Sequence, residues 1–200
     1  MLGKSHLLVG LTAGVVFDSV THVSGPPLIG SDHTITLAMV INKALFYVMV
    51  GIGALLPDID NAHSTLGKKL GWFSREIQHV VGHRTLLHSF LGLGIVAVLG
   101  IGLEKAVEFL LASRGYTVPE HAIASTHIVL IALLFGYIMH IAADALTEEG
   151  VPLFWPLHKY YGFPPNRHRR FRTGTWPEHV IVYSFMLLVG IGIYYSVIGI

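Results

Sequence analysis

The sequence predicts an all-α membrane protein: a polytopic bundle of about five transmembrane helices that form a single integral membrane domain over residues 1–200. The first observation behind this prediction is the composition. Of the 200 residues, 52% are hydrophobic and only 12% are charged, and the mean hydropathy is +0.62. Soluble domains usually carry about 25% charged residues. The second observation is a series of five long apolar runs separated by polar segments.

The composition also limits the classes of function. The net charge of +1 gives no overall electrostatic attraction to nucleic acid, so we expect no nucleic-acid partner. The absence of cysteine excludes disulfides and thiolate metal ligands. The 13 histidines are an unusually large number for this length. Any metal site must therefore use nitrogen and oxygen ligands.

Residues 7–17 form the first apolar run, and the predicted helix continues through Val20. Lys4, in front of this run, is also compatible with a signal peptide, but no clear small-residue cleavage site follows. We therefore interpret the run as the first membrane helix. The segment 21–33 contains two glycines and two prolines, so we predict a loop there.

The second apolar run covers residues 35–56, which is long enough to cross a hydrocarbon core about 30 Å thick. Pro57 ends it. Farther on, residues 66–81 place apolar side chains at helical spacing, with basic residues between them. This pattern predicts an interfacial amphipathic helix on the membrane surface. The alternative is a solvated helix that packs on the bundle. The apolar positions are Leu66, Leu70, Phe73, Ile77 and Val81, and the basic ones are Lys68, Lys69 and Arg75.

Three further apolar runs complete the predicted bundle. Residues 86–103 form the third run, and the mixed segment 104–119 after it ends in a turn. Residues 125–146 form the fourth run. The segment 147–178 contains five prolines and is predicted to be a long irregular loop. Residues 180–200 form the fifth run, which carries no charge.

The distribution of lysine and arginine predicts the orientation of the bundle. With five spans, ten basic residues fall on the side of the N-terminus: Lys4, Lys68, Lys69, Arg75, Arg84, Lys159, Arg167, Arg169, Arg170 and Arg172. Only Lys105 and Arg114 fall on the other side. Basic residues favour the cytoplasmic side of a membrane protein. We therefore predict a multi-pass protein of the inner (plasma) membrane, with a cytoplasmic N-terminus and an external C-terminus.

Seven candidate metal ligands lie at the predicted cytoplasmic ends of four apolar runs: His6, Asp58, Asp60, His83, His88, His140 and Asp144. Imidazole and carboxylate groups are common metal ligands. Ionisable residues at the edge of an apolar helix are costly and usually functional. Any one histidine alone would fit a hydrogen-bonded core residue. Their convergence on one membrane face favours a metal site instead.

Helical spacing indicates which faces turn inward. His140 and Asp144 are four residues apart, so they share one face. Positions four residues along the helix from His6, His88 and His140, and eight residues from His6 and His140, share the faces of these histidines and hold small residues. Small residues allow transmembrane helices to approach closely. These residues are Gly136 and Ala132, Gly10 and Gly14, and Gly92. Asp18 should lie about 18 Å along the helix from His6, so we leave it out of the site.

His83 and His88 are five residues apart and would point about 140° apart on a continuous helix. We therefore predict that the third membrane helix begins near Thr85, with His83 on the preceding turn.

Four stretches resemble the YdjM-like family of inner-membrane proteins, a LexA-regulated family described as membrane-bound metal-dependent hydrolases. They are HLLVG at 6–10, LLPDIDNAHSTLGKKL at 55–70, GHRTLLHSFL at 82–91 and GYIMHIAADALTEEGVPLFWP at 136–156. Their order and spacing agree with the family over about residues 1–160. Thr85 and Leu87 stand where the family shows Gly and Thr in His-Arg-Gly-x-Thr-His-Ser. The resemblance implies a helical membrane protein and metal-dependent hydrolysis.

The chemistry that these residues permit is metal-assisted hydrolysis of a phosphoester. Seven ligands exceed the four that one tetrahedral zinc needs, so we expect two divalent ions, with zinc the first choice and manganese or magnesium the alternatives. We assign Asp60 as the proton acceptor and Arg84 as a phosphate clamp, although Arg84 also fits a basic membrane anchor. At headgroup depth, a lipid-linked phosphate is the expected substrate. The alternatives are a metal-binding membrane protein without activity and a transporter; the oligomeric state stays open.

Overall fold

The computed structural model describes residues 1–26, 35–81 and 85–198, and this part contains seven α-helices and no β-strand. The helices are α1 (Gly3–Thr21), α2 (Leu37–Gly53), α3 (Thr65–Leu70), α4 (Trp72–Val81), α5 (Phe90–Ser113), α6 (Glu120–Ala145) and α7 (Trp176–Ile198). Three short 3-10 helices join them: η1 (Leu56–Asp60), η2 (Leu86–His88) and η3 (Arg167–Arg169). The predicted all-α class is confirmed.

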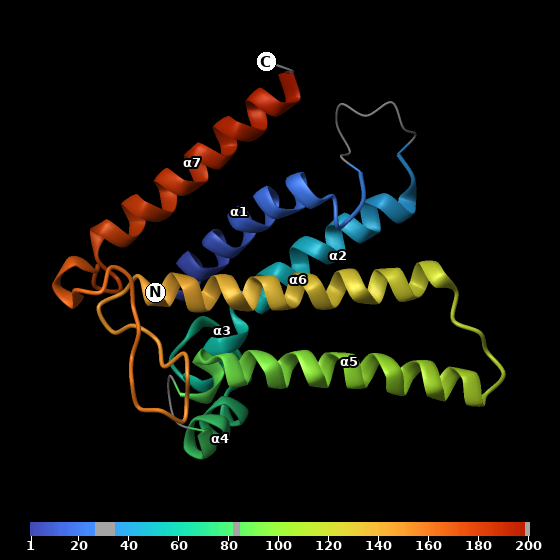
Figure 1. The fold of residues 1–200 in the computed structure, drawn as a ribbon, viewed down its shortest axis with the longest axis horizontal. Helices are drawn as coiled ribbons and strands as arrows, with labels where there is room; N and C mark the ends of the chain where they lie inside the picture. The colour runs from blue at the N-terminus through green and yellow to red at the C-terminus, as the bar shows by residue number, and fades with distance from the viewer. Residues whose placement is uncertain (27–34, 82–84, 199–200) are drawn as a thin grey trace.

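The five long helices α1, α2, α5, α6 and α7 occupy the five predicted apolar runs (Figure 1). Within the described residues, three stretches are long and apolar enough to cross a bilayer: Leu37–Asp60, Phe90–Ser113 and Ala122–Ala145, with mean hydropathies of 1.9, 1.9 and 2.1. Many of their side chains are exposed on the protein surface, as expected where lipid surrounds the helices.

Small residues allow the central helices to pack closely. A Cβ atom added to Gly136 of α6 would lie 2.1 Å from the Val50 carbonyl oxygen of α2. A Cβ on Gly10 of α1 would lie 2.6 Å from the Cβ of Ala54. Side chains larger than hydrogen therefore do not fit at these crossings. The prediction that the small-residue faces turn into the bundle is confirmed.

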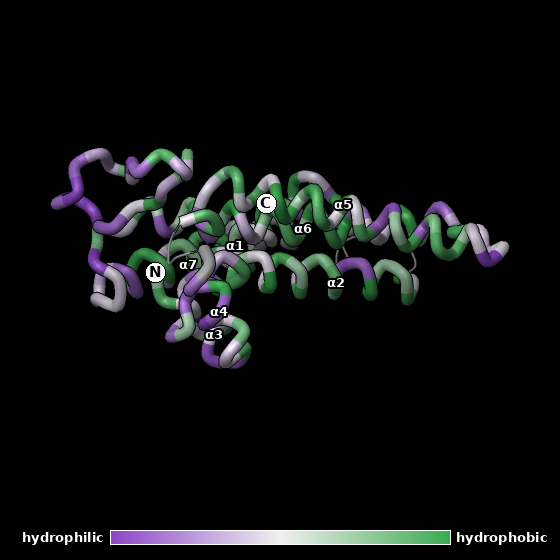
Figure 2. The backbone as a smooth tube through the Cα atoms, turned by 90° about the horizontal axis from the view of Figure 1, so that it is seen from below, coloured by the Kyte–Doolittle hydropathy of each residue, from purple (hydrophilic) through white to green (hydrophobic). Residues whose placement is uncertain are grey.

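The polar segments gather at one end of the bundle. In Figure 1 this end holds the N-terminus, α3, α4, the first turns of α5 and α7, and the last turn of α6. Figure 2 shows hydrophilic residues along the long segment between α6 and α7 at the same end. That segment contains only the short η3 and two isolated β-bridges, so the predicted irregular loop is confirmed.

The predicted amphipathic helix over 66–81 is two helices rather than one. Gly71 has a φ of +57°, a left-handed conformation that ends α3, and α4 begins at the next residue. Ser74 is fully buried, and its hydroxyl donates to the carbonyl oxygen of Ile59 at 2.6 Å. Trp72 and Phe73 are exposed instead. The pair of helices therefore packs on η1 through polar contacts and leaves aromatic side chains outside.

The third membrane helix begins later than we predicted. Residues Leu86–His88 form η2, and α5 starts only at Phe90. Ser89 is the N-cap, because its hydroxyl accepts a hydrogen bond from the backbone N–H of Gly92 at 3.2 Å. The predicted start near Thr85 was wrong because a serine cap four residues downstream sets the boundary.

Asp18 lies away from the predicted ligands, as expected. It is buried where α1 meets α2, and its carboxylate accepts from Lys43 Nζ at 2.9 Å and from the Ser24 hydroxyl at 2.6 Å. Its charge is therefore paired within a structural cluster.

Candidate metal centre

Six of the seven predicted ligands belong to the described part of the chain, and the structure brings all six together in the interior. They are His6 from α1, Asp58 and Asp60 from η1, His88 from η2, and His140 and Asp144 from α6. None is more than 7% exposed. His83 and Arg84 lie outside the described residues.

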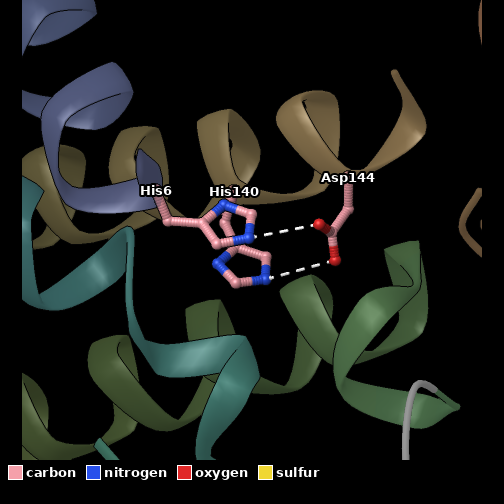
Figure 3. Close-up of side chains that lie close together, drawn as sticks. All are labelled: His6, His140 and Asp144. Carbon is pink, nitrogen blue, oxygen red and sulfur yellow. Dashed lines mark ion pairs between the residues drawn. The ribbon is translucent and has the colours of Figure 1, made fainter. Parts of the chain in front are cut away.

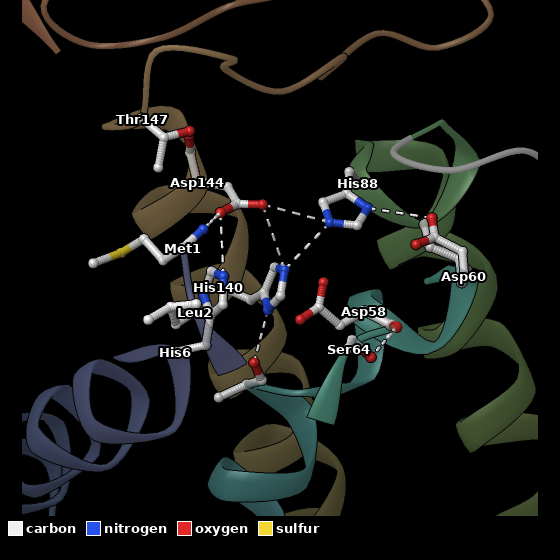
Figure 4. Close-up of polar contacts among 12 residues, drawn as sticks. Met1, Leu2, His6, Asp58, Asp60, Ser64, His88, His140, Asp144 and Thr147 are labelled. Carbon is white, nitrogen blue, oxygen red and sulfur yellow. Dashed lines mark hydrogen bonds and ion pairs between the residues drawn. The ribbon is translucent and has the colours of Figure 1, made fainter. Parts of the chain in front are cut away.

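Three donor atoms form a compact triangle (Figure 4). The Nε2 atoms of His88 and His140 are 3.3 Å apart. The Oδ2 atom of Asp144 lies 3.6 Å from the first and 3.7 Å from the second. Ligands bound at about 2.0–2.1 Å in a tetrahedron are about 3.3 Å apart. The triangle therefore has nearly the dimensions of three ligands that share one cation.

A backbone carbonyl fixes the tautomer of His140. The Nδ1 atom of His140 lies 2.7 Å from the carbonyl oxygen of Ala54. A carbonyl only accepts, so Nδ1 carries the proton and Nε2 keeps its lone pair for the triangle. Ala54 is the C-cap of α2, where terminal carbonyls have no partner within the helix. Sequence reasoning missed this contact, since a backbone acceptor leaves no signal in side-chain identity.

His6 and Asp58 extend the triangle into two overlapping sets. The His6 ring stacks on that of His140, with centroids 3.6 Å apart, and its Nε2 lies 3.1 Å from Asp144 Oδ1 (Figure 3). The donor atoms of His6, His140 and Asp144 all lie within 4.8 Å of one another, and so do those of Asp58, His88 and His140. The amino group of Met1 also contacts Asp144. Five side chains, the shared His140 among them, can therefore provide ligands to this centre.

The imidazole of His6 has a ring nitrogen without a hydrogen-bond partner among the described residues. The Nδ1 atom of His6 is buried, and no partner for it is found among the described residues. Leaving a buried polar atom unpaired costs about 1–3 kcal/mol. A cation beside the ring would remove part of that cost. Together with the imidazole and carboxylate donors, this atom indicates that the residues fit a divalent metal ion.

Asp60 lies behind His88. Its Oδ2 atom is 3.4 Å from His88 Nδ1, the ring nitrogen opposite the one in the triangle. Asp60 belongs to neither of the two donor sets. This position is typical of a carboxylate that orients a metal-binding histidine. Its predicted roles as ligand and proton acceptor stay predictions.

Tyr137 supports the turn that carries His88. Its side chain is fully buried, and its hydroxyl donates to the carbonyl oxygen of Leu87. Tyr137 precedes His140 by three residues on α6, so both side chains lie on one helix face. The sequence prediction omitted Tyr137, although its spacing from His140 was a signal that could have identified it.

Two further polar side chains hold the elements that carry His6 and Asp58. Glu178, at the start of α7, is fully buried and accepts from the backbone N–H groups of Leu2 and Gly174, each at 2.8 Å. It thereby fixes the segment before His6. The hydroxyl of Ser64 donates to the carbonyl oxygen of Asp58 at 2.8 Å and fixes η1.

Nearly the whole chain, residues 1–199, matches the family model described as YdjM inner membrane protein. The chain is 37% identical over 110 residues to the inner membrane protein YdjM of Escherichia coli (strain K12), which covers 55% of this chain and 48% of that protein. The YdjM of Shigella flexneri matches with the same identity and coverage. The matched region thus spans about half the length of these relatives.

The chain is also similar to the uncharacterized protein YvsG of Bacillus subtilis (strain 168), with 27% identity over 136 residues, which covers 68% of this chain and 70% of YvsG. No solved structure matches. Because the family model covers almost every residue, and because the described helices include three that can span a bilayer, the chain belongs to the YdjM family of inner membrane proteins.

Proposed function

We propose that this protein is a metal-dependent hydrolase that acts on a phosphoester at the cytoplasmic face of the inner membrane. The observation that carries the proposal is the triangle of His88, His140 and Asp144, whose donor atoms are 3.3 to 3.7 Å apart. The alternative for buried histidines is a hydrogen-bonded core without metal. However, two imidazole Nε2 atoms and a carboxylate oxygen at these spacings suit a shared cation better.

His88, His140 and Asp144 would hold one ion, and His6 and Asp58 would complete its sphere or help to hold a second ion. Zinc is the first choice because three of these five ligands are imidazoles, with manganese or magnesium as the alternatives. A bound divalent ion makes water more acidic and neutralises charge on a phosphoryl oxygen. The carbonyl of Ala54 and the carboxylate of Asp60 lie beside the Nδ1 atoms of the two histidines, a position from which such groups commonly orient metal ligands.

Two roles are open to Asp60, acceptance of a proton from water and orientation of His88, and two variants distinguish them. If Asp60 accepts a proton from water, both Asp60→Asn and Asp60→Ala should reduce turnover by about a hundredfold or more. If it only orients His88, Asn keeps an acceptor oxygen and should retain most of the activity, whereas Ala should not. Both variants should keep at least one metal ion. Arg84 remains our predicted phosphate clamp.

The second candidate is a metal-binding membrane protein without turnover. The burial of the ligands favours it, since structural metal sites are closed whereas catalytic sites keep an open position. A transporter fits less well, because transporter sites usually lie near the bilayer midplane, whereas this centre lies at one end of the bundle (Figure 1).

The experiment is phosphate release by purified protein in detergent after loading with zinc, manganese or magnesium. Substrates should include lipid phosphate monoesters, lipid pyrophosphates and soluble phosphate esters. We expect turnover by the wild type that is lost in Asp144→Asn. Metal-loaded wild type that hydrolyses none of these substrates would refute the hydrolase and leave the metal-binding alternative.

A further inference from the structure

An open cleft lies directly beside the metal centre. Its volume is about 690 Å³, and Asp58 contributes to its lining. Asp58 is also a member of the donor set with His88 and His140. Binding pockets for small molecules usually measure about 300–1,000 Å³. The cleft is therefore large enough for a polar headgroup, and it leads from the protein surface to a metal ligand.

Two lysines line the cleft that leads to the metal centre. Lys68 and Lys69 are exposed side chains in the last turn of α3, and both line the cleft. The lining also holds two carboxylates, Asp58 and Glu149, and a cation bound at the centre would offset the charge of Asp58. With metal in place, the two lysine charges outnumber the single carboxylate charge of Glu149, so the entrance keeps a net positive charge.

Local structure holds the helix that bears these lysines against the segment that carries Asp58. The Ser64 hydroxyl caps α3 by accepting from the Gly67 N–H at 2.9 Å, and it donates to the Asp58 carbonyl oxygen at 2.8 Å. A Cβ on Gly67 would lie 1.9 Å from the carbonyl oxygen of Asn61. The helix that bears the lysines is therefore packed tightly against the segment that bears Asp58.

A segment outside α3 and η1 also contributes a polar side chain to the cleft. Thr173 lines the cleft, and its Oγ1 atom is shielded from solvent without a hydrogen-bond partner among the described residues. This hydroxyl would gain a partner if the side chain turned toward an anionic oxygen bound in the cleft. Trp72 and Phe73, exposed at the start of α4, suit the interface between lipid and water, which would bring the cleft to headgroup level.

We propose that this cleft is the substrate site, and that Lys68 and Lys69 bind the phosphate group of an anionic substrate whose scissile bond faces Asp58 and the metal centre. This inference rests on the proposed hydrolase function for the direction of the substrate. The recognised chemistry is a terminal phosphate, which both a lipid headgroup and a soluble phosphate monoester present. Lysine ammonium groups form charge-assisted hydrogen bonds with phosphate oxygens.

The test measures ligand binding, and phosphate release is followed in the same samples so that binding is read before turnover. Radiolabelled orthophosphate and dioctanoyl phosphatidic acid are titrated into purified metal-loaded protein in detergent, and metal content is measured in parallel. The double variant Lys68→Gln/Lys69→Gln should bind both probes at least about tenfold more weakly at unchanged metal content. Lys68→Arg/Lys69→Arg should retain binding. The matched control, Arg167→Gln/Arg169→Gln, removes two exposed charges outside the cleft and should bind like the wild type.

Each outcome has a separate meaning. Wild-type affinity in the lysine double variant, or an equal loss in the arginine control, would overturn the cleft proposal. Tighter binding of phosphatidic acid than of orthophosphate, lost in the lysine double variant, would assign the cleft to a lipid, and the reverse preference would assign it to a soluble phosphate. Lysine-dependent binding without turnover of any phosphoester would refute the hydrolase while leaving the anion site in place.

Discussion

Replacing Gly136 with alanine should separate α2 from α6 and damage the metal centre from a distance. The added Cβ would lie 2.1 Å from the Val50 carbonyl oxygen and 2.8 Å from the backbone nitrogen of Ala54. Ordinary contact begins near 3.4 Å, so the helices must move apart by roughly 1.3 Å. Both obstacles are backbone atoms, which cannot rotate out of the way as a side chain can.

That displacement acts directly on the orientation of His140. The Ala54 carbonyl, on the same stretch of α2, lies 2.7 Å from His140 Nδ1, and hydrogen bonds of this kind weaken beyond about 3.2 Å. Losing a contact that orients a metal ligand typically reduces metal affinity by about 10- to 100-fold. Overpacking costs about 1–3 kcal/mol, which lowers the unfolding temperature by roughly 2–12 °C for a chain of this size.

The assay is thermal unfolding in detergent, with zinc affinity measured by competition against a chelator. Gly94→Ala is the matched control, because a Cβ on Gly94 of α5 would meet no atom within 4 Å. It should unfold at or slightly above the wild-type temperature, since alanine favours helix. Unchanged unfolding temperature and zinc affinity in Gly136→Ala would refute the idea that this close crossing holds the centre.

Three further predictions follow from other parts of the molecule. A reporter fused after Ile200 should be external and one inserted at His158 should be cytoplasmic, because basic residues favour the cytoplasmic side. The opposite pattern would place the metal centre at the external face of the membrane. Lys43→Met should lower the free energy of unfolding by about 3–5 kcal/mol at unchanged metal content, since it leaves Asp18 without its cation; retained stability in a denaturation series would contradict this. Arg75→Gln should weaken the preference of the bilayer-embedded protein for anionic lipid by about 1 kcal/mol if α4 lies at the membrane surface, and an unchanged lipid preference would favour a helix away from lipid.

The sequence was sufficient to predict the helices and the group of ligands because both follow from short-range periodicity. His140 and Asp144 share a face at any crossing angle, and the glycines in steps of four mark the sides on which helices meet. The alternation of the five predicted spans placed the candidate ligands at one membrane face before any contact was known, and the count of lysines and arginines separately predicted that this face is cytoplasmic.

The details of the centre depend on contacts that periodicity does not encode. The stacking of His6 on His140 requires a particular crossing of α1 and α6, and the tautomer of His140 depends on a backbone carbonyl from α2. Ser89 caps α5 and so moves its start downstream of the predicted position. Gly71 adopts a left-handed conformation and so divides the predicted helix over 66–81 into α3 and α4. The position of Asp60 behind His88 likewise appears only in three dimensions.

The central claim is that His140 is the shared ligand of a divalent metal centre, and metal analysis of purified protein tests it most directly. We predict that the wild type carries one or two divalent ions per chain, that His140→Ala loses them with a fall in unfolding temperature, and that His158→Ala, which removes an exposed histidine, retains them. Metal content in His140→Ala equal to that of the wild type, or a wild type that binds no divalent ion after zinc, manganese or magnesium loading, would contradict the account.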